Sequence, residues 1–362
     1  MVRVIPFKAY RYNGEKVGDM GKVVAPPYDV IKGKKVDEIQ SLSPYNIAWI
    51  TKNKPREGDT ADSNQYTRAR DHLREWIDKG ILVRDPEDCY YVYGQNFEID
   101  GEPLFRFGFI GLIELEEFAK EAPPEGGFAG VLQHEETLPK DIQDRLNLSR
   151  NTLSYFGQIF VIYPDSEGDV DSVLESYMET EPVMDVNDMD GVRHRLWKVA
   201  KTRDIETISR AMESKFVIIA DGHHRYKTAL ALRKEHPELE TAGYRMLTFV
   251  NMSNPGLVIL PTHRLVQNLE SFDKEKLLSD LRSNFIVRSY DGKDPMFREM
   301  DRLFKEGKHA FGLYMNDGKF YSMELKDLCP MDGLRPDASA DLRKLDVAIL
   351  HSMILDRVLG ID

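Results

Sequence analysis

The segment 216–226 constrains the fold more than any other part of the chain. A run of apolar residues, 216–220, ends at Asp221-Gly222, and a helix-forming pattern begins with His223. A buried strand that turns directly into a helix gathers main-chain N–H groups, the positive end of the helix dipole and polar side chains in one small volume. This arrangement favours the binding of a phosphate or another anion.

Each residue of this turn has an expected role. Asp221 is expected to cap the helix, because a carboxylate accepts hydrogen bonds from the free N–H groups of a first turn. Gly222 lets a ligand approach the backbone closely. His223, His224 and Arg225 supply donors to an anion. In the alternative interpretation Asp221 only caps, Arg225 pairs with a surface carboxylate, and the histidines bond to core carbonyls.

A second polar cluster lies upstream of this turn. Its candidate site residues are His134, Glu135, Glu136, Lys140 and Arg145. A carboxylate here could accept the proton of a hydroxyl group, and Lys140 or Arg145 could neutralise phosphate charge. The zinc-protease motif is absent, because position 137 is threonine rather than histidine. The alternative is a charged helix start in which Lys140 pairs with Asp144.

Two shorter clusters are weaker candidates. His263-Arg264 follows Pro261-Thr262 at the end of an expected strand, and Tyr28-Asp29 follows a double proline. We expect Asp29, His263 and Arg264 to contact substrate or phosphate. A turn residue or a surface pair explains either cluster about as well.

Composition narrows the class of partner. The chain of 362 residues carries 49 Lys and Arg against 61 Asp and Glu, a net charge of -12, which disfavours unspecific binding to nucleic acid or anionic membranes. Cys89 and Cys329 stand too far apart in sequence to indicate a disulfide framework or a zinc site. No apolar run reaches the length of a bilayer span. We therefore expect a cytoplasmic protein that binds small molecules and ligates no metal through its own side chains. A homo-oligomer is compatible with these features.

The pattern of elements favours an α+β fold over a parallel doubly wound one. Helices are expected over 62–80, from about 139, from 223 to about 234, and as a C-terminal amphipathic helix over 345–358. Hairpins are expected over 89–115 and across 316–318, and strands at 158–163, 244–251 and 257–260. An acidic linker with two helices is expected over 164–215. Clear antiparallel hairpins among helices are the basis for this class.

The motifs His134-Glu135-Glu136 and Asp221 to Tyr226 together resemble the ParB/sulfiredoxin superfamily, and most closely its archaeal free-serine kinase (SerK-like) branch. Over most of its length, including 26–30, 261–264 and 345–347, the chain looks like a large family of unknown function grouped with that branch. The resemblance implies an N-terminal accessory region over 1–84, a ParB/sulfiredoxin-like nucleotide-binding domain over 85–265 and a C-terminal α/β region over 266–362.

The resemblance also implies a function. ADP or ATP with Mg²⁺ would be bound at Gly222 to Arg225, and Glu135 or Glu136 would be the general base, with Asp221 as a further catalytic residue. His134, Lys140 and Arg145 would contact substrate or phosphate. The leading expectation is a nucleotide-dependent phosphotransferase acting on a small hydroxyl metabolite, with free serine as first candidate. The alternatives are a non-catalytic nucleotide switch and a metal-dependent hydrolase using His134, His223 and Glu136.

Overall fold

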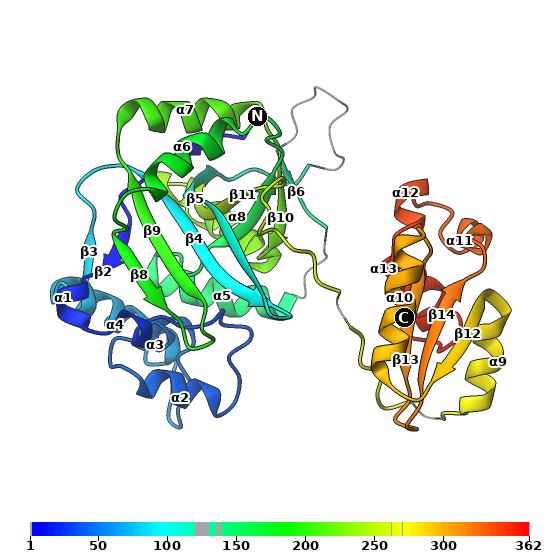
Figure 1. Cartoon of the computed structure of the whole chain (residues 1–362). Coiled ribbons are helices and arrows are strands. Elements are labelled where there is room, and N and C mark those ends of the chain that lie inside the picture. Colours follow the sequence, from blue (N-terminus) through cyan, green and yellow to red (C-terminus); the bar gives the residue numbers. More distant parts are fainter. Residues whose placement is uncertain (1, 120–129, 135–138, 262, 270, 362) are drawn as a thin grey trace. The chain divides into compact units, whose positions relative to one another are not determined.

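The computed structural model describes residues 2–119, 130–134, 139–261, 263–269 and 271–361. The chain divides into two compact units, Met1–Leu260 and Pro261–Asp362. Each unit combines helices with a sheet, which confirms the expected α+β class (Figure 1). Whether 1–84 forms an accessory region of its own stays a prediction.

The first unit is built on one large mixed sheet. Its strands lie in the order β6 (Val131–Leu132), β10 (Val217–Asp221), β7 (Ile159–Tyr163), β11 (Tyr244–Asn251), β5 (Glu102–Glu114), β4 (Tyr90–Ile99), β9 (Arg193–Val199) and β8 (Met184–Asn187). β1 (Val4–Ile5) pairs with β5 off this path. The pairs β6·β10 and β7·β11 are parallel, and the other pairs are antiparallel.

Helices pack beside this sheet in two groups. One group is the series α3 (Ala48–Thr51), α4 (Gln65–Asp78), α5 (Pro139–Thr152) and α8 (His223–Glu235), in which each helix contacts the next. The other is the pair α6 (Asp169–Met178) and α7 (Thr202–Glu213). The shorter elements of the unit are α1 (Gly14–Val17), η1 (Met20–Lys22), α2 (Lys35–Ser41), η2 (Glu240–Gly243) and the two-stranded sheet of β2 (Tyr10–Tyr12) and β3 (Leu82–Arg84).

The core of the first unit joins the central strands to α6, α7 and α8. Phe109 of β5 and Phe249 of β11 stack with ring centroids 4.7 Å apart, and both side chains are fully buried. Tyr226 and Ala229 of α8 belong to the same core. The packing of α8 on this core and its contacts with β11 position the candidate site.

Two expectations about this unit are wrong. Residues 257–260 form no strand: they follow a turn at Pro255-Gly256 without a partner strand, and Ile259 is 94% exposed. The expected acidic linker of 164–215 contains β8 and β9 in addition to its two helices. β9 was missed because charged residues such as Arg193 and Arg195 interrupt its apolar positions, as often occurs towards the edge of a sheet.

The second unit has a three-stranded antiparallel sheet in the order β12 (Phe285–Tyr290), β14 (Phe320–Leu325), β13 (Ala310–Tyr314). Its helices are α9 (Lys274–Asn284), α10 (Lys293–Lys305), α11 (Cys329–Leu334), α12 (Ala340–Arg343) and α13 (Asp346–Ile349), followed by the π-helical segment η3 (Leu350–Asp356). The expected C-terminal helix is present as one helical run, in which α13 continues directly into η3. A core of its own, including Phe285, Phe311 and Ile349, holds this unit together.

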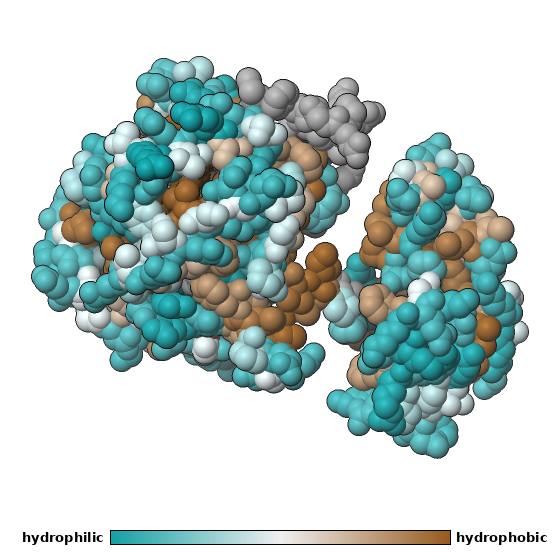
Figure 2. Space-filling model, turned by 45° about the horizontal axis from the view of Figure 1, so that its top comes forward, coloured by the Kyte–Doolittle hydropathy of each residue, from teal (hydrophilic) through white to brown (hydrophobic). Residues whose placement is uncertain are grey.

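The visible surface is mainly hydrophilic, with scattered apolar areas (Figure 2). Across the described residues, we find no helix with both the length and the apolar character required to cross a membrane.

Candidate anion-binding site

The turn between β10 and α8 has the strand-to-helix geometry that the sequence indicates, but Asp221 does not cap the helix. The N-cap residue is Gly222, with φ of +104°, and it has no side chain with which to cap α8. The Asp221 carboxylate instead accepts a hydrogen bond from Nη2 of Arg225. The capping prediction is wrong because a guanidinium one turn away makes a charge-assisted bond that a neutral N–H group cannot match.

Gly222 is required by this geometry, and its replacement by alanine is expected to destabilise the protein by about 1–3 kcal/mol. Alanine would have to adopt the left-handed backbone conformation of Gly222. Its Cβ would also lie only 3.0 Å from Nε of Arg225. Urea unfolding of Gly222→Ala should show this loss. The control is Gly243→Ala, where a Cβ meets no atom within 4 Å; equal stabilities of the two variants would contradict the prediction.

The structure brings the two sequence motifs together at this turn. β6 runs parallel to β10, with Val131 beside Val217 and Leu132 beside Ile218, so His134 comes to the end of β10 where α8 begins. The main-chain N–H of His134 donates to Nε2 of His223 at 3.4 Å, and the two rings meet edge to face with centroids 4.6 Å apart.

The histidines of the turn differ in exposure. His223 is only 2% exposed, and its Nε2 acts as an acceptor, because a main-chain N–H can only donate. Nδ1 of His224 is buried and has no hydrogen-bond partner among the described residues. Glu135 and Glu136, the expected bases, lie outside the described residues, and so does the side chain of Lys140. Their roles stay predictions.

Three arginines line one small cavity beside the turn. They are Arg145 of α5, Arg225 of α8 and Arg245 of β11. The cavity has a volume of about 20 Å³, and Leu148, Ser149, Tyr155, Phe156 and Thr228 complete its wall. Sequence reasoning selected Arg145 and Arg225 but missed Arg245. A usable signal existed, since Arg245 is the one charged residue within the strand 244–251.

Arg145 is held by partners from the N-terminal region. Its guanidinium donates to Asp144 and to the carbonyl of Thr51, and it lies 3.9 Å from the ring centroid of Tyr28. Tyr66 donates to the same Asp144 at 2.8 Å. The alternative pairing of Lys140 with Asp144 lies outside the described side chains, and Asp144 is engaged by Arg145 and Tyr66.

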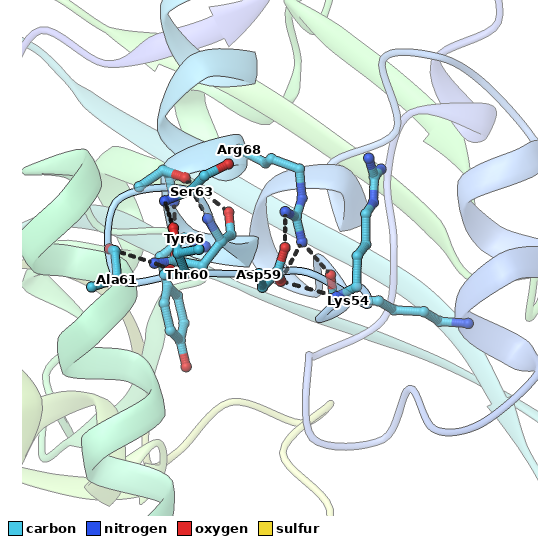
Figure 3. A network of polar contacts seen from close by, with 10 residues as sticks. Lys54, Asp59, Thr60, Ala61, Ser63, Tyr66 and Arg68 are labelled. Carbon is cyan, nitrogen blue, oxygen red and sulfur yellow. Dashed lines mark hydrogen bonds and ion pairs between the residues drawn. The ribbon is translucent and has the colours of Figure 1, made fainter.

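A polar network fixes the start of α4, which carries Tyr66 (Figure 3). Arg68 donates to both carboxylate oxygens of Asp59 and to the carbonyl of Lys54. Asn64 caps the helix by accepting from the N–H groups of Tyr66 and Thr67. Tyr66, which donates to Asp144, is therefore positioned by the segment around the start of α4. This segment lies far from Asp144 in sequence.

The remaining predicted residues are placed as follows. Asp29 lies near Lys52: burial and the charge of Arg145 lower the pKa of Lys52, and Asp29 opposes them. His263 and Arg264 belong to the second unit, where the Arg264 guanidinium bonds to the ring of His351 at 3.1 Å. Their roles at the site stay predictions.

A large apolar cavity of about 790 Å³ adjoins the small one. Apolar side chains dominate its lining, among them Leu112, Leu196 and Met246, and the two cavities share Tyr155 and Phe156. A volume of this size is in the range of small-molecule pockets. Nothing in the sequence pattern predicted it, because its walls come from many separate segments.

Metal ligation is a separate question. Within the part of the chain that the structure describes, no group of three or more His, Cys, Asp and Glu could hold a metal ion. The hydrolase alternative also relies on Glu136, which falls outside that part.

Fold and site together define a two-unit α+β protein with a glycine at the N-cap of a helix and clustered arginines beside one strand-to-helix turn. The chain belongs to the family described as "Protein of unknown function (DUF1015)", whose model matches residues 4–348. No curated protein and no solved structure matches the chain.

The resemblance to the ParB/sulfiredoxin superfamily is wrong. The family match covers 4–348 as one family of unknown function, and nothing in it indicates that superfamily. A strand that turns through glycine into a helix is a local solution to anion binding that unrelated folds share, so short motifs at such a turn do not identify a fold.

Proposed function

We propose that the chain is a nucleotide-dependent phosphotransferase that acts on a small hydroxyl metabolite at the turn between β10 and α8. The observation that carries the proposal is the meeting of two motifs 89 residues apart, where the N–H of His134 reaches the ring of His223. Polar groups from separate strands converge there on the start of a helix.

The phosphates would be bound at the start of α8. Its N-cap residue is glycine, which lets a ligand approach the backbone closely, and the helix dipole adds positive potential at this end. His224 stands in the first turn of α8 with a buried Nδ1 that lacks a partner among the described residues. Arg225 adds positive charge, although Asp221 and the carbonyl of Gln158 already occupy two of its nitrogens.

The proton acceptor would come from the upstream motif. Glu135 and Glu136 directly follow His134 in sequence, and the ring of His134 contacts the ring of His223. In the proposed reaction a glutamate takes the proton of the acceptor's hydroxyl group. The hydroxyl oxygen then bonds to the terminal phosphorus of the nucleotide, and the bond between this phosphorus and the oxygen of the leaving nucleotide breaks. Mg²⁺ bound together with the nucleotide would offset the negative charge of the phosphates, so catalysis would rest on positioning and charge neutralisation.

Phosphorus NMR tests the proposal directly. Full-length protein is incubated with Mg²⁺, ATP or ADP, and a panel of hydroxyl metabolites that includes serine. We expect a phosphomonoester signal with at least one acceptor. Glu135→Gln should slow its appearance about 100-fold or more, the usual contribution of a general base.

The matched control is Glu206→Gln, an exposed carboxylate on α7 outside the site. Its rate should equal that of the wild type. If no acceptor is phosphorylated faster by the wild type than by Glu135→Gln or by Glu136→Gln, the phosphotransferase is ruled out. If nucleotide still raises the melting temperature in that case, the non-catalytic switch takes its place.

A further inference from the structure

Arg245 is a buried cation without a carboxylate partner among the described residues. Only 2% of its surface is exposed. Nη2 donates to the carbonyl of Gly157 at 2.7 Å, while Nε and Nη1 are buried and have no hydrogen-bond partner in the part of the chain that the structure describes. The hydroxyl of Tyr155, whose ring centroid lies 4.2 Å from the guanidinium, is also buried and has no partner within that part.

The charges around the small cavity do not balance. Asp144 pairs with Arg145, and Asp221 pairs with Arg225, so no carboxylate of the described residues is left to compensate the third guanidinium. Burial lowers the pKa of Arg245 to about 9, and the charge of Arg225 also lowers it. At neutral pH the group is still a cation. A buried charge of this kind is costly unless an opposite charge and hydrogen bonds accompany it.

We propose that the cavity lined by Arg145, Arg225 and Arg245 holds a small monovalent anion, either chloride or the carboxylate group of an organic acid. Nε and Nη1 of Arg245 and the Tyr155 hydroxyl are the donors that would bind it. Among the described residues that line this cavity, these three groups are the buried polar atoms without a hydrogen-bond partner. An anion there satisfies them and compensates the third charge in one step.

The size of the cavity sets the class of ligand. Its volume of about 20 Å³ is close to that of a single water-sized site, which fits chloride or one end of a carboxylate but not a whole nucleotide. Tyr155 and Phe156 also border the apolar cavity of about 790 Å³. The hydrocarbon part of an organic acid would occupy the large cavity, whereas chloride would occupy only the small one. The proposal does not depend on phosphotransfer.

Chloride-35 NMR of the full-length protein without nucleotide tests the site. We expect the wild type to broaden the chloride line, and formate to remove the broadening by competition. Ionic strength is kept constant with a bulky sulfonate buffer, which does not fit the cavity. If aliphatic acids of increasing chain length compete better than formate, the carboxylate source is favoured; if they compete no better, chloride is the natural occupant.

Arg245→Met is the diagnostic variant, because methionine fills similar space without charge. It should lose the chloride broadening and the rise of melting temperature with chloride or formate that bound ligand produces. Arg150→Met is the control: Arg150 is on the same α5 as Arg145 but pairs with Glu235 at an exposed site, and should retain both effects.

Three results would overturn the proposal: a wild-type chloride line with no excess width, broadening that formate does not displace, or broadening unchanged in Arg245→Met. If Arg245→Met does not fold, Ser149→Leu replaces it. Ser149 is a buried wall residue, and the larger side chain would fill the cavity while all three arginines remain. The wild-type competition stands by itself in either case.

Discussion

Gly108→Ala is expected to destabilise the first unit by about 3 kcal/mol or more. Gly108 lies in β5, and a Cβ there would stand 2.1 Å from the carbonyl oxygen of Phe249 and 2.8 Å from Cγ2 of Val250. The nearest atom is main chain, so no side-chain rotation relieves the clash. β5 is hydrogen-bonded to β4 on one side and β11 on the other, which prevents it from moving away.

The measurement is urea unfolding followed by far-ultraviolet circular dichroism, with Gly243→Ala as control. No atom lies within 4 Å of the Cβ position of residue 243, so this variant should stay within about 0.5 kcal/mol of the wild type. If Gly108→Ala were as stable as the control, the close packing of β5 against β11 described above would be incorrect.

Asp85→Asn is expected to cost about 2–4 kcal/mol of stability. The Asp85 carboxylate is nearly buried and accepts from Nε and Nη2 of Arg11 at 2.8 and 2.7 Å and from the hydroxyl of Tyr91 at 2.5 Å. Lys198 adds a second cation at 3.8 Å. The amide keeps the shape of the side chain but leaves Arg11 without a counter-ion.

The same carboxylate makes stability depend on pH. The hydrogen bond from Arg11 is the main cause that lowers the pKa of Asp85, with Tyr91 and Lys198 acting in the same direction. A lowered folded-state pKa means that the contribution is fully present above the unfolded-state pKa, about 4, and is lost as pH falls through the folded-state value. The difference between wild type and Asp85→Asn should therefore shrink below about pH 4.

Denaturation curves of both proteins between pH 7 and pH 3 measure this difference. Asp37→Asn is the control, because its carboxylate is 70% exposed in its pair with Lys54, and an exposed pair contributes less than about 1 kcal/mol. A difference between wild type and Asp85→Asn that stayed constant with pH would argue against an ionised Asp85 in the folded protein.

Local patterns in the sequence determined much of the fold. The hairpin of β4 and β5 turns at Asp100-Gly101, where both residues have positive φ, as the Asp-Gly signal indicates. α4 and β11 were predicted from apolar periodicity, and the turn before α8 from an apolar run that stops at Asp221-Gly222. These features rest on neighbours in the chain, so a single sequence is sufficient to predict them.

The candidate site was predicted in part. Sequence reasoning selected His134, His223, Arg145 and Arg225, which the structure gathers beside one turn. It assigned Asp221 to the wrong partner, because the competing guanidinium of Arg225 becomes a neighbour only once the helix has formed. It also inferred a superfamily from short motifs that the family match contradicts.

Only the tertiary structure decided which charges are left uncompensated. Arg245 stands in an apolar strand, and nothing near it in sequence shows that α5 and α8 bring two further guanidinium groups, each with its own carboxylate, to the same cavity. Strand and turn identity follow from contacts over a few residues. The balance of buried charge depends on groups about 100 residues apart, because electrostatic and hydrogen-bonding partners are chosen by distance in space.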